Sequence, residues 1–542
     1  MKEYLYSAFN EAAKKIPQLK EIQISLDIPK SIDHGDLSCN AAMLLTKILK
    51  KNPKVIAQEI IDSLSVQDSV ISKIEIAGPG FINFYFTTTY TPKIIRDILD
   101  KKEKFGRSIK YKGKKANVEF VSANPTGPLT VGHGRNAVVG DTVANLLEWI
   151  GYDVEREYYF NNAGRQMRVL GDSVKLRYLE LLGDKIEFPN DYYQGEYIKD
   201  IAMQLFIKHG STLRNKDPES IFKDTAEQEI FFDIKKSLIN LGINHKIFFN
   251  ENTLYEDGKI EKILRTFKEK NLSYEKDNAI WLKLSELGQN EDKVIVKNTG
   301  EPTYRLPDIA YHAVKLDRGY ELLVDLFGSD HNATYPDVMA GLNAIGYDSS
   351  KIRVLIHQFV TIMDGGEVVK MSTRKANYIT LDELNEEVGK DVVRYFFNMR
   401  NVNSHMIFDL AVAKKQSDEN PVFYLQYAHA RISSILRRVR EEQLEVSTNN
   451  LNLLIHEDEQ VLLKVLHNFV EEVYNSAENL EPHKLCTYLY DLAGSYHKFN
   501  RTCRILGTER NLAEARLALA YATMIVIKNG LSILGVSAPE QM

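Results

Sequence analysis

The segment Val118-Glu-Phe-Val-Ser-Ala-Asn-Pro-Thr-Gly-Pro-Leu-Thr-Val-Gly-His133 contains the sharpest change of pattern in the chain. Residues 117–121 form a short apolar run typical of a buried strand, and the Asn, Pro and Gly residues that follow cannot continue it. From His133 onward, apolar residues recur at helical spacing until Gly151, a stop signal. Residues 153–160 then read as a second strand. Strand, Gly-rich turn, helix and strand open a doubly wound α/β domain, where ligands bind at the carboxyl ends of the strands.

The turn before this helix has the chemistry of a nucleotide site. Gly132 has no Cβ, so the backbone can approach a ligand closely. Free N–H groups in the first helical turn can bind phosphate, and His133 is expected to add a charge-assisted donor. An ordinary strand–turn–helix unit with a surface histidine would show the same short pattern, so this segment alone is a weak signal.

A second candidate segment, Val369-Lys-Met-Ser-Thr-Arg-Lys375, follows more than two hundred residues later. Residues 353–362 are predicted to form a strand, Asp364-Gly-Gly366 a turn, and residues 370–377 a polar loop with three cations. Such a loop can close over ATP and stabilise charge on the leaving pyrophosphate. The alternative is a solvated basic loop, which is the usual outcome of a charge run. The order of the two segments favours the functional interpretation.

The composition is typical of a soluble globular protein with several domains. The 542 residues are 44% hydrophobic and 26% charged, and this length corresponds to about three or four domains. No apolar stretch is expected to reach the roughly 18 residues that span a bilayer, and the N-terminus lacks the apolar core of a signal peptide. Three widely spaced cysteines exclude a disulfide framework and a Cys-type zinc site. We therefore expect a cytoplasmic protein without a membrane partner and without a bound metal.

The net charge of −5 argues against a general nucleic-acid binder. Any RNA contact must come from local patches with shape and base-specific contacts. Two candidates are residues 101–115, with eight Lys or Arg in fifteen positions, and residues 431–440, with four arginines. Both could equally be solvated surface.

Taken together, the two segments resemble the HIGH and KMSKS motifs of class I aminoacyl-tRNA synthetases. Other residues narrow the resemblance to the arginyl-tRNA synthetase family. Asp33-His-Gly-Asp36 and Ala77-Gly-Pro-Gly80 are similar to that family's N-terminal domain, and residues 418–431 resemble its anticodon-binding helical bundle. The resemblance covers nearly the whole chain and is weakest over residues 170–270.

The resemblance implies a multidomain α/β plus all-α protein with three domains. We expect a tRNA-contacting N-terminal α+β domain over residues 1–105 and a Rossmann-type, parallel-sheet catalytic domain over residues 106–400. A C-terminal helical, anticodon-binding domain is expected over residues 401–542. Residues from about 165 to 290 read as a helical, charged insertion into the catalytic domain. An editing site is not required, because arginine is large and cationic enough for a selective pocket.

An arginine pocket needs carboxylates in fork geometry, since a guanidinium is planar, always charged and rich in donors. The segment 302–312 supplies candidates, because Pro307 suits the first turn of a helix. Asp308 would then lie at the start of that helix, although an acid there is more often a simple helix-end charge. The resemblance implies an arginine-binding set of Glu119, Asn124, Tyr304, Asp308 and His331.

The implied reaction joins L-arginine to tRNA(Arg) in two steps. The arginine carboxylate attacks the α-phosphate of Mg-ATP, which gives arginyl-adenylate and pyrophosphate. A hydroxyl of the 3′-terminal ribose of the tRNA then attacks the activated carbonyl. The resemblance implies a monomer that uses ATP with Mg²⁺, needs no zinc, and requires bound tRNA even for adenylate formation. The residues expected at ATP or in catalysis are Thr130, Gly132, His133, Lys370, Met371 and Ser372, with Arg374 supporting the loop.

Thr130 departs from the family pattern, because it stands where the first histidine of the HIGH motif is usual. Threonine can donate one hydrogen bond but carries no charge, and the lost charge-assisted bond is worth about 1.5–3 kcal/mol. Either Arg135 or Lys375 compensates for this loss, or the enzyme is slower.

Fewer residues support the resemblance where the family contacts the anticodon. Aromatic side chains can stack on unpaired bases, but at helical spacing they are equally often part of a core. The resemblance places Tyr424, Arg431, Tyr496 and Met542 at the anticodon loop.

Two alternatives remain open. One is another class I specificity: acidic pocket residues disfavour glutamate, and the missing Cys/His zinc set disfavours cysteine. The other is a catalytically impaired tRNA-binding paralogue. Only Thr130 favours that paralogue, whereas the intact Gly132-His133 and Lys370-Met-Ser372 argue against it.

Overall fold

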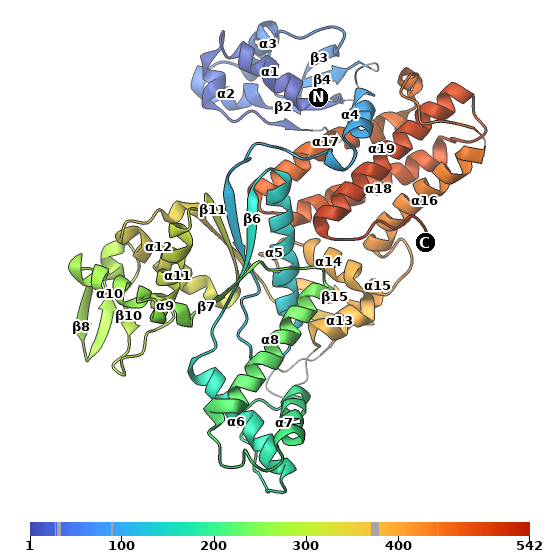
Figure 1. The fold of residues 1–542 in the computed structure, drawn as a ribbon. Coiled ribbons are helices and arrows are strands. Elements are labelled where there is room, and N and C mark those ends of the chain that lie inside the picture. Colours follow the sequence, from blue (N-terminus) through green and yellow to red (C-terminus); the bar gives the residue numbers. More distant parts are fainter. Residues whose placement is uncertain (28, 30–33, 88–89, 91, 370–378, 442) are drawn as a thin grey trace.

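A central sheet of five parallel strands, in the order β12-β11-β5-β6-β7, organises the middle of the chain (Figure 1). We analysed a computed structural model, which describes residues 1–27, 29, 34–87, 90, 92–369, 379–441 and 443–542. The candidate residues Lys370, Met371, Ser372, Arg374 and Lys375 therefore lie outside the described residues. The strands are Lys115–Glu119 (β5), Asp153–Phe160 (β6), Ile247–Asn250 (β7), Leu322–Gly328 (β11) and Ile352–His357 (β12).

Helices cover both faces of this sheet, as predicted for a doubly wound domain. Helix α5 (Val131–Trp149) connects β5 to β6 and lies on one face. Helices α11 (Arg305–Asp317) and α12 (Tyr335–Ala344) lie on the other (Figure 1). The predicted strand–turn–helix–strand unit and the predicted helix after Tyr304 are both confirmed.

Side chains of the strands alternate between these two faces, and the faces differ in chemistry. Ala116, Val118 and Tyr158 join the apolar core that includes α5. Glu119 and Glu157 point the other way and bond to side chains of α11. One strand therefore presents hydrocarbon to one layer of helices and carboxylates to the other.

The stretch expected as one helical insertion is purely helical only in its first part. It contains α6 (Gly164–Leu181), α7 (Glu196–His209) and α8 (Lys223–Asn240). The chain then returns to the central sheet as β7, which pairs in parallel with β6. A second segment follows, with α9 (Asn252–Glu256), α10 (Lys259–Glu269) and the antiparallel strands β8 (Ser273–Lys276), β9 (Ala279–Leu282) and β10 (Lys293–Val296). The strand β7 was missed because four residues are too few to show a period.

The single strand expected over residues 353–362 is two strands in different sheets. After β12, the chain breaks at residues 358–359 and continues as β13 (Val360–Asp364). This strand pairs with β14 (Glu367–Val368) and, in parallel, with β15 (Met406–Asp409). The region beyond residue 405, expected to be almost purely helical, therefore begins with a strand. Helices α13 (Leu381–Val388), α14 (Lys390–Asn398) and α15 (Leu410–Ala413) surround this second sheet.

The N-terminal unit is an α+β body with its own apolar core, as expected. Helices α1 (Lys2–Ala12), α2 (Ala41–Leu49) and α3 (Pro53–Ser63) pack on an antiparallel sheet of order β1-β2-β4-β3. Its strands are Leu26–Asp27, Leu37–Cys39, Ile71–Ala77 (β3) and Phe81–Phe86 (β4). Helix α4 (Lys93–Lys101) follows, and an ion pair of 2.6 Å between Asp36 and Lys464 joins this unit to the C-terminal helices.

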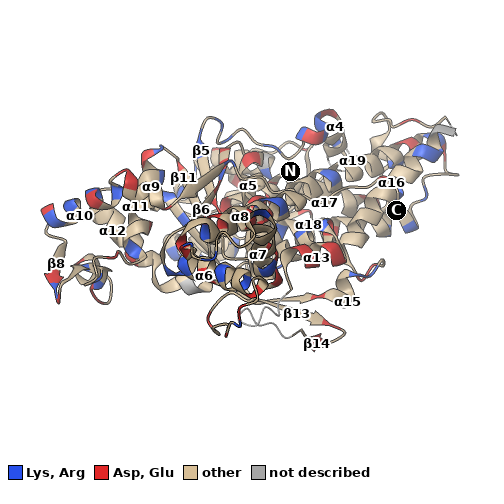
Figure 2. Ribbon diagram, turned by 60° about the horizontal axis from the view of Figure 1, so that its bottom comes forward, with Lys and Arg blue, Asp and Glu red and all other residues tan. Residues whose placement is uncertain are grey.

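The C-terminal region is a bundle of α16 (Pro421–Glu441), α17 (Glu457–Asn479), α18 (Pro482–Thr502) and α19 (Arg510–Leu534). Contrary to expectation, α19 is long and apolar enough to cross a membrane by length and composition. However, 78% of its most apolar window is buried inside the fold, as in a core helix. Charged residues of both signs are spread over the whole molecule (Figure 2).

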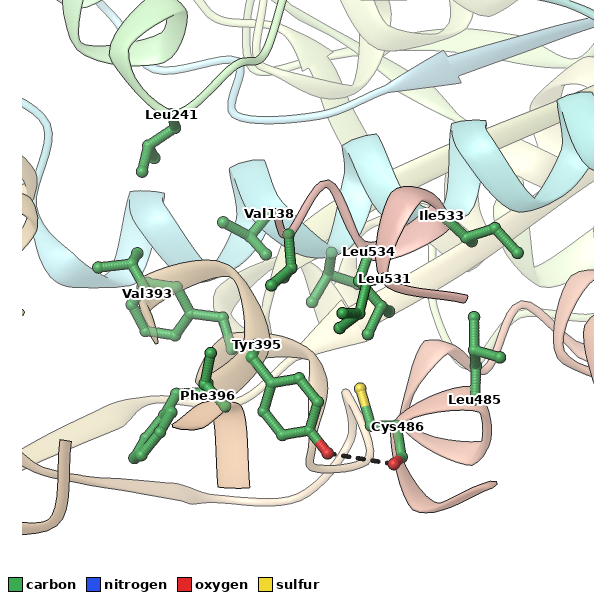
Figure 3. Packing of buried hydrophobic residues seen from close by; sticks show 14 of the residues in the cluster. Val138, Leu241, Val393, Tyr395, Phe396, Leu485, Cys486, Leu531, Ile533 and Leu534 are labelled. Atoms are coloured by element: carbon green, nitrogen blue, oxygen red, sulfur yellow. Dashed lines mark hydrogen bonds between the residues drawn. The ribbon is translucent and has the colours of Figure 1, made fainter. Parts of the chain in front are cut away.

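The bundle and the region around the central sheet share one continuous core. Arg394 on α14 is buried at their junction, where it donates to Leu534 O (2.7 Å), Leu241 O (3.0 Å) and Asp141 Oδ2 (2.6 Å). Figure 3 shows apolar side chains of this junction, together with the hydrogen bond of 3.1 Å from Tyr395 to the Cys486 carbonyl. The junction therefore combines hydrocarbon packing with one guanidinium that reaches three distant segments.

Candidate active site

The first candidate element is the N-terminus of α5, which Thr130 precedes as the N-cap residue. The backbone N–H of Thr130 donates to Nδ1 of His133 at 3.2 Å. Because Nδ1 accepts, the proton of the neutral ring lies on Nε2. Burial and the nearby His357 lower the pKa of His133 to about 4. The expectation that His133 is a charge-assisted donor is therefore wrong for the ligand-free protein, in which His133 is a neutral donor.

Arg135 follows His133 by two positions in α5 and does not compensate for the histidine that is missing at position 130. Its side chain is fully buried, and its guanidinium donates to the carbonyls of Gln358 (2.8 Å), Asn401 (2.9 Å) and Ser404 (3.0 Å). These bonds fix α5 to the second sheet. The alternative of compensation by Arg135 is therefore wrong, and Lys375 lies outside the described residues.

The turn after β5 has a strained backbone. Val121 and Ser122 have positive φ angles of 69° and 44°, which are unusual for residues other than glycine and cost roughly 1–3 kcal/mol each. Side chains hold the turn in place: Val121 N donates to Asn136 Oδ1 (2.7 Å) and the Ser122 hydroxyl donates to Glu119 (2.9 Å). Strain that is fixed by its surroundings in this way is typical of ligand sites.

Two further candidates lie at the carboxyl ends of neighbouring strands. Asn124 donates to Gln166 (2.8 Å) and accepts from the Asn161 N–H (3.2 Å), which follows β6. His331 lies in the short helical turn after β11 and stacks on Phe327, with ring centroids 5.0 Å apart. The sheet therefore brings Asn124 and His331 to the same edge as Thr130, the N-cap residue of α5.

Three carboxylates form a row across the sheet, on the face covered by α11. The strand register places Asp325 beside Glu119 and Glu119 beside Glu157, and all three are buried. We call these three residues the carboxylate row. At one end of the row, Arg318 donates to Glu157 at 2.6 Å. Buried carboxylates this close together require cations between them.

Lys315 and His312, both on α11, supply the cations for the rest of the row. The Lys315 ammonium lies 2.7 Å from Glu119 Oε2 and 2.5 Å from Asp325 Oδ1. His312 Nε2 lies 2.9 Å from Asp325, and Nδ1 lies 2.7 Å from the carbonyl oxygen of Asp308. Burial alone would lower the pKa of His312, but the Asp325 carboxylate raises it above its ordinary value.

Two other acids near this network have no ion pair among the residues that the structure describes. Asp308 begins α11 as predicted, and Glu251 follows β7. The pKa of Asp308 is raised to about 7, mainly by burial, with His312 opposing the rise and the nearby Glu119 and Glu251 adding to it. Burial also raises the pKa of Glu251, whose carboxylate accepts from the Tyr159 hydroxyl at 2.6 Å.

Glu251 and Lys315 were both missed by the sequence analysis. The signal for Glu251 was its place at the carboxyl end of a strand, but β7 itself was not recognised. Lys315 could have been noted as a lysine on the otherwise apolar side of a predicted helix. Tyr304, in contrast, was expected and stands at the N-terminus of α11 with 83% of its surface exposed.

The candidate anticodon residues separate into buried and exposed ones. Tyr496 is fully buried in the bundle, so its ring cannot stack on a base in this conformation, and that expectation is wrong. Tyr424 is half-buried and packs on His497, with ring centroids 4.5 Å apart. Arg431 and Met542 are exposed.

Sequence reasoning missed an aromatic group on the same part of the bundle. Tyr427 and Tyr490 are both partly exposed, and they lie around Tyr424 and His497, with ring centroids 5.1–5.9 Å apart. No group of three His, Cys, Asp or Glu residues in the described part of the chain is arranged to hold a metal ion.

A parallel sheet with this nucleotide-type turn, joined to a helical bundle, defines a class I aminoacyl-tRNA synthetase. The family model described as "tRNA synthetases class I (R), catalytic domain" matches residues 94–404. Two more models, "Arginyl tRNA synthetase N terminal domain" and "DALR anticodon binding domain", match residues 3–86 and 425–542. The chain belongs to the arginyl-tRNA synthetase family.

Similar proteins agree with this assignment over the full chain. The arginine–tRNA ligase of Desulfotalea psychrophila is 47% identical over 521 residues, which cover 96% of this chain and 94% of that protein. The arginine–tRNA ligase of Salinibacter ruber is 46% identical, with both chains fully covered. The solved structure of Thermus thermophilus arginyl-tRNA synthetase has the same fold, with a TM-score of 0.81, 22% identity and full coverage of both chains.

Proposed function

We propose that this chain is an arginine–tRNA ligase, which activates L-arginine with ATP and transfers it to the 3′-terminal ribose of tRNA(Arg). One observation carries the proposal. Asp308 and Glu251, two acids without an ion pair among the described residues, lie at the same sheet edge as the N-terminus of α5. A planar guanidinium is the cation that two such carboxylates suit best.

The ATP subsite is proposed at the N-terminus of α5 and the second motif. Among the residues that the structure describes, a Cβ added at Gly132 would meet only the Thr130 hydroxyl, at 3.7 Å, so their packing does not demand a glycine there and a ligand can use the space. His133 donates from Nε2, and Thr130 fixes that tautomer through its backbone. Lys370, with Met371 and Ser372, is proposed to act on the phosphates of Mg-ATP, and no zinc takes part.

The arginine subsite follows from the remaining candidates. Asp308 and Glu251 pair with the guanidinium, and the exposed Tyr304 ring covers it. Asn124 and His331, at the strand ends, bind the backbone groups of the substrate. Glu119 acts on the site indirectly, because its carboxylate holds the strained turn through Ser122.

The reaction needs no nucleophile from the protein. The site holds the arginine carboxylate in line with the α-phosphate, and the second motif stabilises the charge that moves onto pyrophosphate. Orientation and charge stabilisation of this kind supply most of the catalysis in such transfers. The tRNA hydroxyl then attacks the arginyl-adenylate.

The tRNA is proposed to lie along the N-terminal unit and the helical bundle. On the bundle, the half-buried Tyr424 and the exposed Arg431 lie on α16, and an exposed Met542 follows α19. Partly exposed rings there can stack on unpaired anticodon bases. The proposal includes a cytoplasmic monomer with domains near residues 1–105, 106–400 and 401–542.

Pyrophosphate–ATP exchange with arginine, measured with and without tRNA(Arg), tests the proposal. Exchange that requires both arginine and tRNA is expected, and Lys370→Ala should suppress it. Absence of exchange in both conditions, with tRNA binding retained, would instead identify a tRNA-binding paralogue without activity.

A further inference from the structure

We infer that Lys315 is a positioning residue for arginine recognition. It balances the charge of Glu119 and Asp325, and so leaves Asp308 and Glu251 as the acids that pair with the substrate guanidinium. The inference rests on the proposed arginine–tRNA ligase function.

The first argument is the place of the Lys315 ammonium. The side chain is fully buried, and its Nζ lies between Glu119 Oε2 (2.7 Å) and Asp325 Oδ1 (2.5 Å). The same nitrogen lies 4.6 Å from the ring centroid of Tyr311. A lysine is rarely buried so completely, and it stays charged only when carboxylates surround it.

The second argument is the protonation of His312. One ring nitrogen faces the Asp308 carbonyl oxygen and the other faces the Asp325 carboxylate. Both of these oxygens accept, so both nitrogens donate and the ring is cationic. His312 and Lys315 together match Asp325 and Glu119, two positive charges against two negative ones.

The third argument concerns the acids that remain without a cation after these charges are paired. Arg318 neutralises Glu157 at the far end of the carboxylate row. Among the described residues, only Asp308 and Glu251 in this neighbourhood then lack a cation. A single guanidinium can donate to both acids and neutralises one of the two charges, whereas a neutral side chain leaves both buried acids without a cation, which disfavours its binding.

The fourth argument is mechanical. Glu119 accepts from Lys315 with one oxygen and from the Ser122 hydroxyl with the other. Without Lys315, Glu119 becomes one more unpaired acid beside Asp308. It would then compete for the guanidinium or release the strained turn at Ser122, and both outcomes weaken arginine binding.

Lys315→Met tests this directly, because methionine keeps the length of the side chain and removes the charge. We expect the KM for arginine in tRNA-dependent exchange to rise about thirtyfold, while kcat falls less than threefold. The double variant Lys315→Met/Glu119→Gln removes one charge of each sign and should return the KM to within about fivefold of wild type. A purely structural role for Lys315 would not give this recovery.

The matched control is Lys246→Met. Lys246 also pairs with a carboxylate, Glu155, at 2.5 Å, but its side chain is 67% exposed, so the KM should stay at the wild-type value. An unchanged KM in Lys315→Met, or a double variant no better than the single one, overturns the inference.

If Lys315→Met does not fold, Glu119→Gln and Asp308→Asn decide the matter. We expect the KM for arginine to rise threefold to tenfold in Glu119→Gln and about a hundredfold in Asp308→Asn. Equal effects would mean that Glu119 itself carries the recognition, and the inference fails. A wild-type protein without arginine-dependent exchange would refute the proposed function instead.

Discussion

The two faces of the central sheet are equally buried but are built from different chemistry. On the α5 face, Phe120 packs so closely that a Cβ on Gly140 would lie 2.3 Å from its ring. On the α11 face, Glu119 and Asp325 are as inaccessible as Phe120, yet each needs a cation within hydrogen-bond distance.

This difference separates stability from recognition. Burying hydrocarbon stabilises the fold by roughly 25 cal/mol for each Å² removed from water. Burying ion pairs carries a desolvation cost that their attraction only partly offsets, and apolar replacements of such pairs are often neutral or stabilising. The α5 face is therefore expected to contribute mainly to stability, and the α11 face to recognition of the charged substrate. Substitutions on the two faces should thus affect different measurements.

The largest effect is expected from Phe120→Ala on the α5 face. Removing a fully buried ring should lower the free energy of unfolding by about 3–5 kcal/mol. The KM for arginine should change less than fivefold, because the ring faces away from the carboxylate row. Denaturant unfolding and exchange kinetics on the same preparation measure both quantities. A rise in the KM for arginine of more than fivefold would contradict the division between the two faces.

Asp308→Asn should show the reverse behaviour. Loss of the carboxylate should reduce kcat/KM for arginine about a hundredfold, which corresponds to about 2.7 kcal/mol. Stability at pH 7 should not fall and should rise slightly, since an unpaired buried carboxylate disfavours the folded state. Steady-state kinetics and thermal unfolding provide the comparison, and a parallel loss of stability would argue that Asp308 is structural.

A smaller effect on stability is expected from Gly140→Ala. The added methyl overlaps Phe120 and should cost roughly 1–3 kcal/mol through overpacking. Combining it with Phe120→Leu should recover at least half of that loss, because the smaller side chain leaves room. Additive losses in the double variant would show that the strain lies elsewhere.

Two further effects concern pH, and they have opposite signs on the two faces. Burial lowers the pKa of His245, which contacts Phe120 and Tyr158, from 6.5 to about 4. The unfolded chain therefore binds the extra proton between these values, and stability should fall as pH falls from 6.5 towards 4. The slope is about 1.4 kcal/mol per pH unit.

For Asp308 the folded pKa of about 7 lies above 3.8. The folded state therefore binds the extra proton, and the contribution of Asp308 to stability is present below pH 3.8 and is lost as pH rises to 7. Between pH 4.5 and 6.5, His245→Phe should lower the slope of the unfolding free energy against pH by about 1.4 kcal/mol per pH unit. The same measurement should show the opposite change in Asp308→Asn. Equal slopes in both variants would contradict the assigned directions.

The sequence predicted the elements whose local signals are strong. The strand before residue 120, the long helix up to Gly151 and the helix that Pro307 starts all have clear periods or end signals. The strand β7 and the break between β12 and β13 did not, because four-residue strands and two-residue breaks leave no period to detect.

Several residues of the candidate site were named from the sequence, but Glu251 and Lys315 were missed, and the surroundings of the named residues could be foreseen only in part. Asp308 lies in the first turn of its helix as expected, since helix ends are encoded locally. Arg135 and Tyr496 point into the core, and Lys315 reaches Glu119 across 196 positions of sequence. Side-chain direction at such places depends on which strands become neighbours, and sequence periodicity does not contain that information.

The junction around Arg394 has a consequence for how the protein is made. Leu534, whose carbonyl accepts from Arg394, follows it by 140 positions. At the usual rates of synthesis, roughly 5–20 residues per second, Arg394 waits about 7–28 s for this partner. During that time one donor of the guanidinium lacks its partner in the bundle, so the junction between the two regions is completed only after α19 has been synthesised.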